Sequence, residues 1–289
     1  MKLKNVAVAV VALALAVGMT ACGGSASSTA ASSSEAASSV AASSEAASEA
    51  ASSEAASTSA AAGELTTVEA GKLTMATNAT FPPYEMTTDA GDFEGIDIET
   101  AQAIADKLGL ELQIDDMDFD AALLSVQQGK ADIAMAGITV TDERKAVMAF
   151  SDSYATGIQS IIVPEGSDIA SPDDLAGKKI GTQRGTTGYI YCTDDFGEDS
   201  VVAYDNGLTA VQALNNGQVD AVVIDNAPAK EFIAANPGLV ILETSYAEED
   251  YAIGLAKGSS LEDAINSALE ELKADGTLQS IVDKYISAE

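Results

Sequence analysis

The chain has 289 residues, enough for one large or two modest domains, and 47% of them are hydrophobic, which is typical of a globular protein with a buried core. It carries 14 Lys and Arg against 45 Asp and Glu, a formal net charge of -31. Such a surface repels phosphate backbones, and no segment is dense in Lys or Arg. The composition therefore argues against nucleic-acid binding.

The sequence contains no histidine and only two cysteines, Cys22 and Cys192. The missing histidine excludes Ser-His and Cys-His nucleophilic catalysis and removes the commonest metal ligand. A lone Cys192 without an activating histidine is expected to be a small core residue. The acidic run 115–120 resembles a calcium loop but lacks the glycine and the closing glutamate. We therefore predict no metal and no cofactor.

The first 22 residues have the pattern of a signal peptide. Lys2 and Lys4 precede an unbroken apolar run over 6–17, which is too short for a comfortable membrane span. Met19-Thr20-Ala21-Cys22 resembles a bacterial lipobox, although leucine is usual at its first position. The resemblance implies that Cys22 is lipidated and becomes the mature N-terminus. Ordinary secretion with an incidental cysteine is the alternative.

Residues 23–63 are nearly all Ala, Ser and Glu. Such a segment cannot bury enough apolar surface to offset the entropy of folding, so we expect a disordered tether between a membrane and a folded domain. A protein-docking role for this segment is the alternative.

From residue 64 onward the sequence alternates between strand and helix patterns. Apolar residues recur at helical spacing over 98–108, and Gly109 and Gly129 follow the ends of expected helices. We expect strands at 72–76, 111–114, 131–136, 179–182 and 219–224, and helices at 98–108, 119–128 and 208–215. This alternation predicts an α/β fold with parallel sheets covered by helices. The sequence of 128–133 is similar to that of 216–221, which is consistent with two lobes of similar structure.

Open parallel sheets bind ligands beyond the carboxyl ends of their strands, which directs attention to 137–139 and 225–226. Arg144 follows the first of these at an expected strand-to-helix turn, and its planar fork matches a carboxylate. A surface ion pair is its ordinary role. Asp225 ends an apolar strand, where it can accept hydrogen bonds from a ligand ammonium or cap the next helix. For both Arg144 and Asp225, the sequence alone does not decide between a ligand-binding role and a structural one.

Two further features of the sequence are weak evidence for a ligand site when each is taken alone. The segment 181–188 joins a strand to a helix start, and its glycines and threonines can hold an anion, although it is no nucleotide-binding fingerprint. Phe81, expected in a loop, and Phe119, at the start of a helix, are core residues by default.

Taken in order, these segments resemble the polar amino-acid-binding solute receptors of ABC importers over about 73–285. The most specific stretches are 93–99, Phe-Glu-Gly-Ile-Asp-Ile-Glu, and 129–154, which contains Ala136-Gly137-Ile138-Thr139-Val140-Thr141-Asp142-Glu143-Arg144-Lys145. The resemblance implies a two-lobed periplasmic-binding-protein fold of type II. The larger lobe is expected at 64–153 plus 253–289 and the smaller lobe at 154–252. Hinge strands are expected near 153–158 and 249–253.

The resemblance also implies roles for individual residues. Arg144 is expected to grip the ligand α-carboxylate, helped by Thr139 and by backbone N–H groups near Thr186. Asp225 and the carbonyl group of Gly137 would receive the α-ammonium.

Other positions would contact the ligand side chain, which Phe81 and Phe119 would enclose. Asn78 stands where relatives often carry Asp, Gln183 where some carry Lys, and Phe119 where Trp is common. Because of these differences from the family pattern, the sequence does not identify the side chain of the ligand.

The predicted function is therefore capture of a polar amino acid by hinge closure, in an extracytoplasmic, membrane-anchored monomer. Its partners would be a permease and an ATPase on separate chains. A dehydratase-like enzyme on the same fold, using Glu85 or Glu143 as acid or base, is one alternative. A ligand sensor that does not transport is the other.

Overall fold

The computed structural model describes residues 65–286. The predicted signal peptide 1–22, the lipidation site Cys22 and the predicted tether 23–63 lie outside the described residues. Within 65–286, no helix is both long and apolar enough to cross a bilayer.

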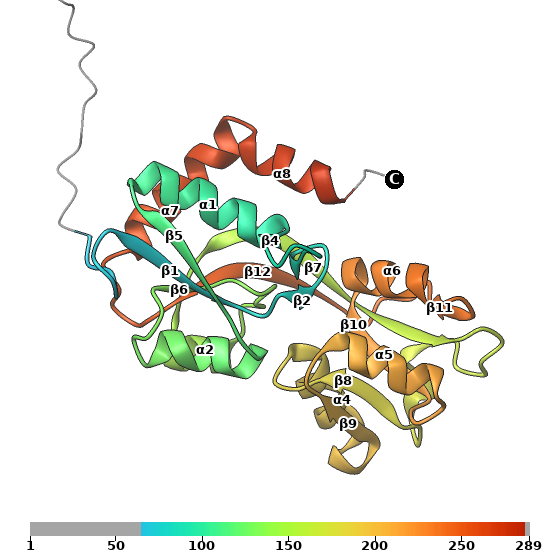
Figure 1. Cartoon of the computed structure of the whole chain (residues 1–289). Coiled ribbons are helices and arrows are strands. Elements are labelled where there is room, and N and C mark those ends of the chain that lie inside the picture. Colours follow the sequence, from blue (N-terminus) through green and yellow to red (C-terminus); the bar gives the residue numbers. More distant parts are fainter. Residues whose placement is uncertain (1–64, 287–289) are drawn as a thin grey trace, which may run out of the picture. The chain divides into compact units, whose positions relative to one another are not determined.

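Helices and strands alternate along the described chain (Figure 1). In chain order the elements are β1 (Lys72–Thr77), β2 (Thr80–Phe81), β3 (Glu85–Thr87), β4 (Phe93–Glu94), α1 (Ile96–Leu108), β5 (Glu111–Asp116), α2 (Phe119–Gln127), β6 (Ile133–Ala134), α3 (Asp142–Val147), β7 (Ala149–Pro164), β8 (Ile180–Gln183), α4 (Thr187–Phe196), β9 (Val201–Tyr204), α5 (Gly207–Asn215), β10 (Ala221–Asp225), α6 (Asn226–Ala235), β11 (Leu239–Ile241), β12 (Ala247–Leu255), α7 (Glu262–Ala274) and α8 (Thr277–Tyr285).

The main sheet runs in the order β5-β1-β6-β12-β7-β10-β8-β9, with β11 paired to β7. At one end β1 pairs in parallel with β5 and β6, and at the other β8 pairs in parallel with β9 and β10. The long strands β7 and β12 pair antiparallel between the two ends. We call β1, β5, β6 and their helices α1, α2, α7 and α8 the β1 side. The β8 side comprises β8 to β11 with α4, α5 and α6.

The sheet is covered by helices on both faces, which explains its apolar strands. On β1, Leu73 and Met75 pack into the core under α1, α7 and α8, whereas Ala76 packs under α2. Figure 1 shows α1, α7 and α8 over one face and α2 over the other. Because neighbouring residues of a strand point to opposite faces, this strand is buried along most of its length.

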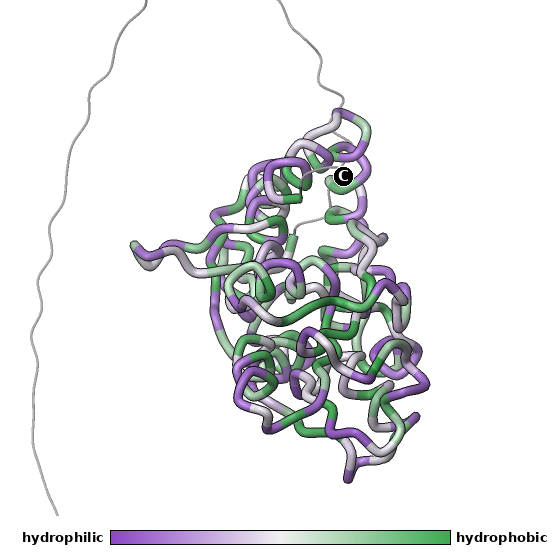
Figure 2. The backbone as a smooth tube through the Cα atoms, turned by 90° about the vertical axis from the view of Figure 1, so that its right-hand side faces the viewer, coloured by the Kyte–Doolittle hydropathy of each residue, from purple (hydrophilic) through white to green (hydrophobic). Residues whose placement is uncertain are grey.

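The β8 side repeats this alternation on β10. Val222 and Ile224 pack with α5 and α6, whereas Ala221 and Val223 pack toward α4 and its buried Cys192. In Figure 2 the hydrophobic stretches, drawn in green, run through the interior and the hydrophilic ones gather on the outer turns. Cys192 is fully buried and has no disulfide partner among the described residues, so its prediction as a core residue is confirmed.

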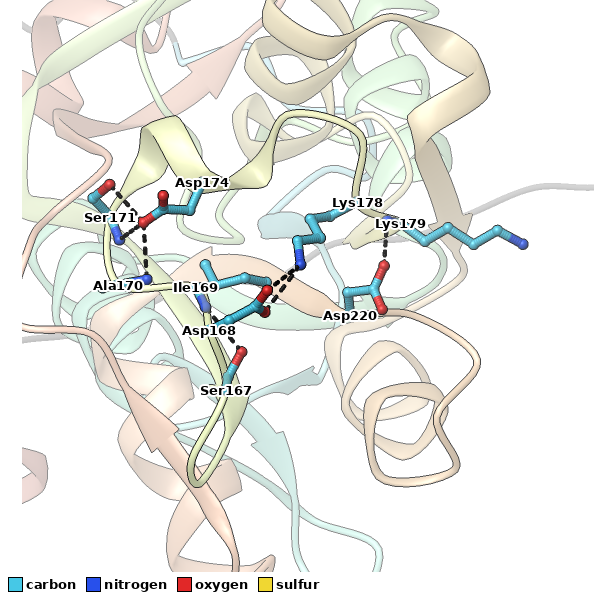
Figure 3. Close-up of polar contacts among 9 residues, drawn as sticks. All are labelled: Ser167, Asp168, Ile169, Ala170, Ser171, Asp174, Lys178, Lys179 and Asp220. Carbon is cyan, nitrogen blue, oxygen red and sulfur yellow. Dashed lines mark hydrogen bonds and ion pairs between the residues drawn. The ribbon is translucent and has the colours of Figure 1, made fainter.

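Polar contacts fix the turn before β8 on the outer end of this side (Figure 3). The Lys178 ammonium donates to both carboxylate oxygens of Asp168 at 2.9 Å. The backbone N–H of Lys179 donates to Asp220 at 2.7 Å, and Asp174 accepts from the Ser171 backbone at 3.0 Å. These contacts lie outside the cavity described below, and they hold β8 in line with β10.

Most expected elements are present within a residue or two of their predicted ends. The helix predicted from 98 begins at Ile96 and ends at Leu108, before Gly109, which has a φ of 70°. Two predictions are wrong in detail. The strand expected at 131–136 is reduced to Ile133–Ala134, because only those residues pair in register with β1. Phe81 lies in the short strand β2, paired with Glu85, and not in a loop.

Candidate functional site

A cavity of about 440 Å³, including the space open at its mouth, lies where the β1 side, the β8 side and the two long strands meet. All nine residues that the sequence nominates for the site line it, namely Asn78, Phe81, Phe119, Gly137, Thr139, Arg144, Gln183, Thr186 and Asp225. The lining also includes Glu85, Ala136, Gln159, Thr187, Val223, Ile224 and Tyr251, none of which was nominated as a ligand contact. This size and mixture of aromatic and polar groups are typical of a small-molecule site.

Arg144 is positioned by the N-terminus of α3. Thr141 caps this helix by accepting from the Arg144 backbone N–H at 3.2 Å. The guanidinium donates to the carbonyl groups of Thr139 at 2.7 Å and Gly185 at 3.1 Å. It lies 5.4 Å from the centre of the Phe119 ring. Burial lowers the pKa of Arg144, yet an arginine stays charged in proteins, so this is a buried cation at the cavity wall.

Asp225 caps α6, one of the two roles that the sequence left open for it, and it also lines the cavity. Its carboxylate accepts from Ala227 N at 3.0 Å, from Ile158 N at 2.8 Å and from the Tyr251 hydroxyl at 2.9 Å. Burial raises the pKa of Asp225 to about 6, and these hydrogen bonds oppose the rise. A carboxylate with lone pairs to spare therefore faces the cavity.

The Gly137 turn brings backbone to the cavity wall. Gly137 has a φ of 54°, and a Cβ there would lie 2.8 Å from a ring carbon of Phe81, so only glycine fits this close approach. Its N–H donates to the buried carboxylate of Asp97 at 3.0 Å. Asp97, at the start of α1, is therefore a positioning residue for this turn.

Thr139 connects the β1 side to the β8 side and to the long strand β12. Its hydroxyl donates to Glu249 at 3.0 Å and lies 3.3 Å from the hydroxyl of Thr187. Glu249 also accepts from Gln159 at 3.0 Å. A buried carboxylate on β12 is thereby fixed behind the threonine, near enough to Arg144 to favour its charged form.

Thr186 is the N-cap of α4. Its hydroxyl accepts from Tyr189 N at 3.4 Å and donates to the carbonyl group of Gln183 at 2.8 Å. The N-terminus of α4 meets the cavity at Thr186 and Thr187. Helix N-termini favour anions through their dipole and their free N–H groups, so this end complements a carboxylate beside Arg144.

Two amides join across the cavity. Gln183 on β8 donates to the side-chain oxygen of Asn78 at 2.9 Å, and Asn78 donates to the carbonyl group of Met117 at 2.9 Å. Both amides lie in the wall of the cavity and hold no charge. They bring the β8 side into direct contact with the residue that follows β1.

Aromatic rings make up the apolar part of the wall. The Phe81 and Tyr84 rings stack with centres 5.7 Å apart, and Tyr84 meets Tyr251 edge-on at 5.4 Å. Phe119 is buried on the first turn of α2. Phe81 and Phe119 therefore do face one cavity, as the sequence predicts.

Glu85 is the main residue that the sequence reasoning did not nominate as a ligand contact. It is fully buried, lines the cavity, and shares a side-chain hydrogen bond with another buried acid, Asp97 of α1. Burial, together with nearby Asp97, holds the pKa of Glu85 well above its usual range. Glu143, the other acid weighed for catalysis, is exposed on α3 and absent from the lining. No local pattern marks Glu85, because its pairing with Asp97 depends on how the chain folds between β3 and α1.

The fold and cavity define a class, the type II periplasmic amino-acid-binding fold. An ancestral arginine-binding protein bound to glutamine superposes with a TM-score of 0.72 at 42% identity, covering 75% of this chain and 99% of that one. The sequence profile of bacterial extracellular solute-binding proteins, family 3, matches residues 73–288.

The chain belongs to the bacterial extracellular solute-binding proteins, family 3. It is 31% identical over 226 residues to the L-cystine-binding protein TcyJ of Escherichia coli K12, covering 76% of this chain and 85% of that one. It is also 31% identical over 231 residues to the arginine-binding extracellular protein ArtP of Bacillus subtilis, covering 75% and 87%.

Proposed function

We propose that this chain is the substrate-binding component of an ABC importer and that it captures an amino acid in the cavity. The observation that carries the proposal is the pairing of opposite charges in one buried site. Arg144 supplies a fixed guanidinium for an α-carboxylate, and Asp225 supplies a carboxylate for an α-ammonium. The relatives named above as amino-acid-binding proteins support it.

In this proposal the remaining lining residues complete the ligand's surroundings. Thr139 and the N-terminus of α4 at Thr186 assist Arg144, and the Gly137 carbonyl group assists Asp225. Phe81 and Phe119 enclose the ligand side chain, while Asn78 and Gln183 contact its polar end.

Capture is proposed to proceed by hinge closure. Lobes at 64–153 plus 253–289 and at 154–252 would rotate about β7 and β12, because lining residues come from both sides of these strands. A ligand that touches both lobes stabilises the closed state, since only there are all its contacts made. The closed form would be recognised by a permease that works with an ATPase, both on separate chains.

We further propose that the protein is a monomer held at the outer face of a bacterial membrane. Lipid on Cys22 would anchor it, after cleavage of the signal peptide 1–22, and 23–63 would act as the tether. It is proposed to bind and not to catalyse. The sequence has no histidine, and the acid in the cavity, Glu85, has no basic residue or nucleophile bonded to it among the described residues.

A thermal-shift screen of the purified chain against the common amino acids and L-cystine tests the proposal. A ligand at 100 times its Kd should add about 2.7 kcal/mol to the free energy of unfolding, which raises the melting temperature measurably. One amino acid, or a small related group, is expected to give this shift. A folded, ligand-free protein that no amino acid stabilises would contradict the proposal.

A further inference from the structure

We propose that Glu249 is a positioning residue for the ligand site, whose carboxylate fixes polar side chains of the cavity wall and does not itself touch the ligand. The inference rests on the proposed function, since it concerns how the same cavity holds an amino acid. Glu249 lies on β12 and is 6% exposed, yet it does not line the cavity.

The first argument is that hydrogen bonds from several wall residues end at this carboxylate. The Oε2 atom of Glu249 accepts from the Thr139 hydroxyl at 3.0 Å and from the Gln159 amide at 3.0 Å. The phenol of Tyr191 on α4 also shares a hydrogen bond with Glu249. Thr139 and Gln159 line the cavity, and both are buried. A buried polar group loses most when its partner is removed, so Glu249 determines how these two side chains are oriented.

The second argument is the direction of these hydrogen bonds. A hydroxyl has one proton, and Thr139 donates it to Glu249, because a carboxylate only accepts. The Thr187 hydroxyl lies 3.3 Å from that of Thr139 and must then be the donor of this contact. Glu249 is therefore the final acceptor of a chain that begins at the N-terminus of α4. It sets the direction in which both hydroxyls point.

The third argument is that the fixed residues come from both proposed lobes. Thr139 belongs to the lobe at 64–153 plus 253–289, whereas Gln159 and Thr187 belong to the lobe at 154–252. One carboxylate therefore holds wall residues of both lobes in place. A binding site needs such support, because its contact residues must keep their geometry to bind tightly.

Strand β12 supports another part of the site in the same way. Residues two apart on a strand point to the same face, and Glu249 and Tyr251 are both buried while their neighbours on either side of Glu249 are not. Tyr251 donates to Asp225 at 2.9 Å. Successive inward-facing side chains of one strand therefore position Thr139 and Asp225.

A counter-charge for Arg144 is the competing role for Glu249. Burial lowers the pKa of Arg144, and the nearby Glu249 carboxylate opposes this. If the charge were what matters, any carboxylate at position 249 would serve. If the position matters, as we propose, an oxygen is required at the place of Oε2 and the charge is not.

Two conservative variants separate these roles. E249Q keeps an oxygen at the place of Oε2 but removes the charge, whereas E249D keeps the charge but withdraws it by one methylene. The probe for calorimetric titration of the full chain is whichever of the common amino acids and L-cystine raises the melting temperature most. The Kd of E249Q should stay within about threefold of the wild-type value, and that of E249D should rise about tenfold.

E248Q and E248D are the matched controls, because Glu248 precedes Glu249 on β12, is exposed and lies outside the cavity. Both should bind as the wild type does. Melting curves show whether each variant is folded. If E249D does not fold, E249Q still decides, since tenfold weaker binding by a folded E249Q would overturn the proposal.

A second background distinguishes positioning from a merely structural role. T139V keeps the shape of the side chain but removes the hydroxyl that Glu249 orients. The Kd of E249D should exceed that of E249Q about tenfold when Thr139 is present, and at most about threefold in the T139V background. A Glu249 that only stabilises the fold would give the same ratio in both backgrounds.

The inference is overturned if E249Q binds as weakly as E249D or more weakly, or if E249D binds like the wild type. Either result leaves the proposed function intact, because an amino acid still binds. Failure of every amino acid to bind the wild type overturns the proposed function, and the inference then falls with it.

Discussion

Two parts of the cavity differ in how the protein prepares them. Arg144 and Asp225 are already hydrogen-bonded, to the carbonyl groups of Thr139 and Gly185 in one case and to three donors in the other. Glu85 is equally buried, but its partner is a second acid, Asp97. The difference indicates that Arg144 and Asp225 are preorganised to face the charged groups of a ligand, whereas Glu85 is held with a raised pKa inside the wall.

The largest effect in this comparison is expected from removing the preorganised cation. R144A would leave the ligand carboxylate buried and unpaired, so the Kd for the bound amino acid should rise about 10²–10³-fold. R144K, which keeps the charge but loses the planar fork, should lie between R144A and the wild type. Calorimetry on both variants checks this. Near-normal affinity in R144A would remove Arg144 from the site.

A smaller loss of affinity is expected from D225N. Asparagine is also a good helix cap, so the contact with Ala227 N is kept while the charge that faces the ammonium is lost. The Kd should rise about 30- to 100-fold. The melting temperature should fall as well, because the amide nitrogen that replaces Oδ2 cannot accept from the Ile158 N–H or the Tyr251 hydroxyl. D220N, altered at an exposed carboxylate outside the cavity, is the control and should bind normally. Equal affinities in the two variants would contradict the role proposed for Asp225.

G157A tests the support behind Asp225. A Cβ at Gly157, on β7, would overlap the ring of Tyr251, whose hydroxyl donates to Asp225. The free energy of unfolding should fall by about 1–3 kcal/mol. Urea unfolding measures this, and affinity should fall as well. T156A, at an exposed position on the same strand, should change neither quantity. If G157A changes neither stability nor affinity, as T156A is expected to, then the Tyr251 ring does not support Asp225 in the way proposed.

A further effect is a pH dependence of stability. Burial raises the pKa of Asp97 and of Asp225 to about 6 from an ordinary 3.8. The unfolded chain loses these protons first as the pH rises, so the stability they contribute is full below pH 3.8 and is lost as the pH passes 6.

Each of these groups should lower the free energy of unfolding by on the order of 2–3 kcal/mol between pH 4 and pH 7.5. D97N, measured by urea unfolding at both pH values, should lose its share of this dependence. D92N, altered at an exposed position, should keep the wild-type slope. A D97N profile parallel to the wild type would contradict the raised pKa.

The parts of the fold and of the site that could be predicted from the sequence are those that depend on neighbouring residues. Helix ends at Gly109 and Gly129 and the alternation of apolar strands and helices are local signals, and they located most of the elements. Asp225 ends β10, and Arg144 lies in the helix that follows β6 and the Gly137 turn. Because an open sheet binds its ligands beyond the ends of its strands, their type and position suggested the site. The cavity brings them together with Phe81 and Phe119, as expected.

The missed residues depend on long-range pairing. Tyr251 lines the cavity, and Glu249 lies behind Thr139, because β12 pairs with β7, and the register of that pairing cannot be read from either strand alone. Glu85 stands out only because it is buried against another acid, Asp97, which is a property of the assembled core. The short length of β6 likewise depends on its register against β1 and β12.

A crystal structure of the chain with the amino acid that stabilises it most in the thermal-shift screen is the most direct test of the proposed site. The account predicts the α-carboxylate on Arg144, the α-ammonium on Asp225 and the side chain between Phe81 and Phe119. An amino acid bound elsewhere, or one with its carboxylate turned away from Arg144, would contradict it.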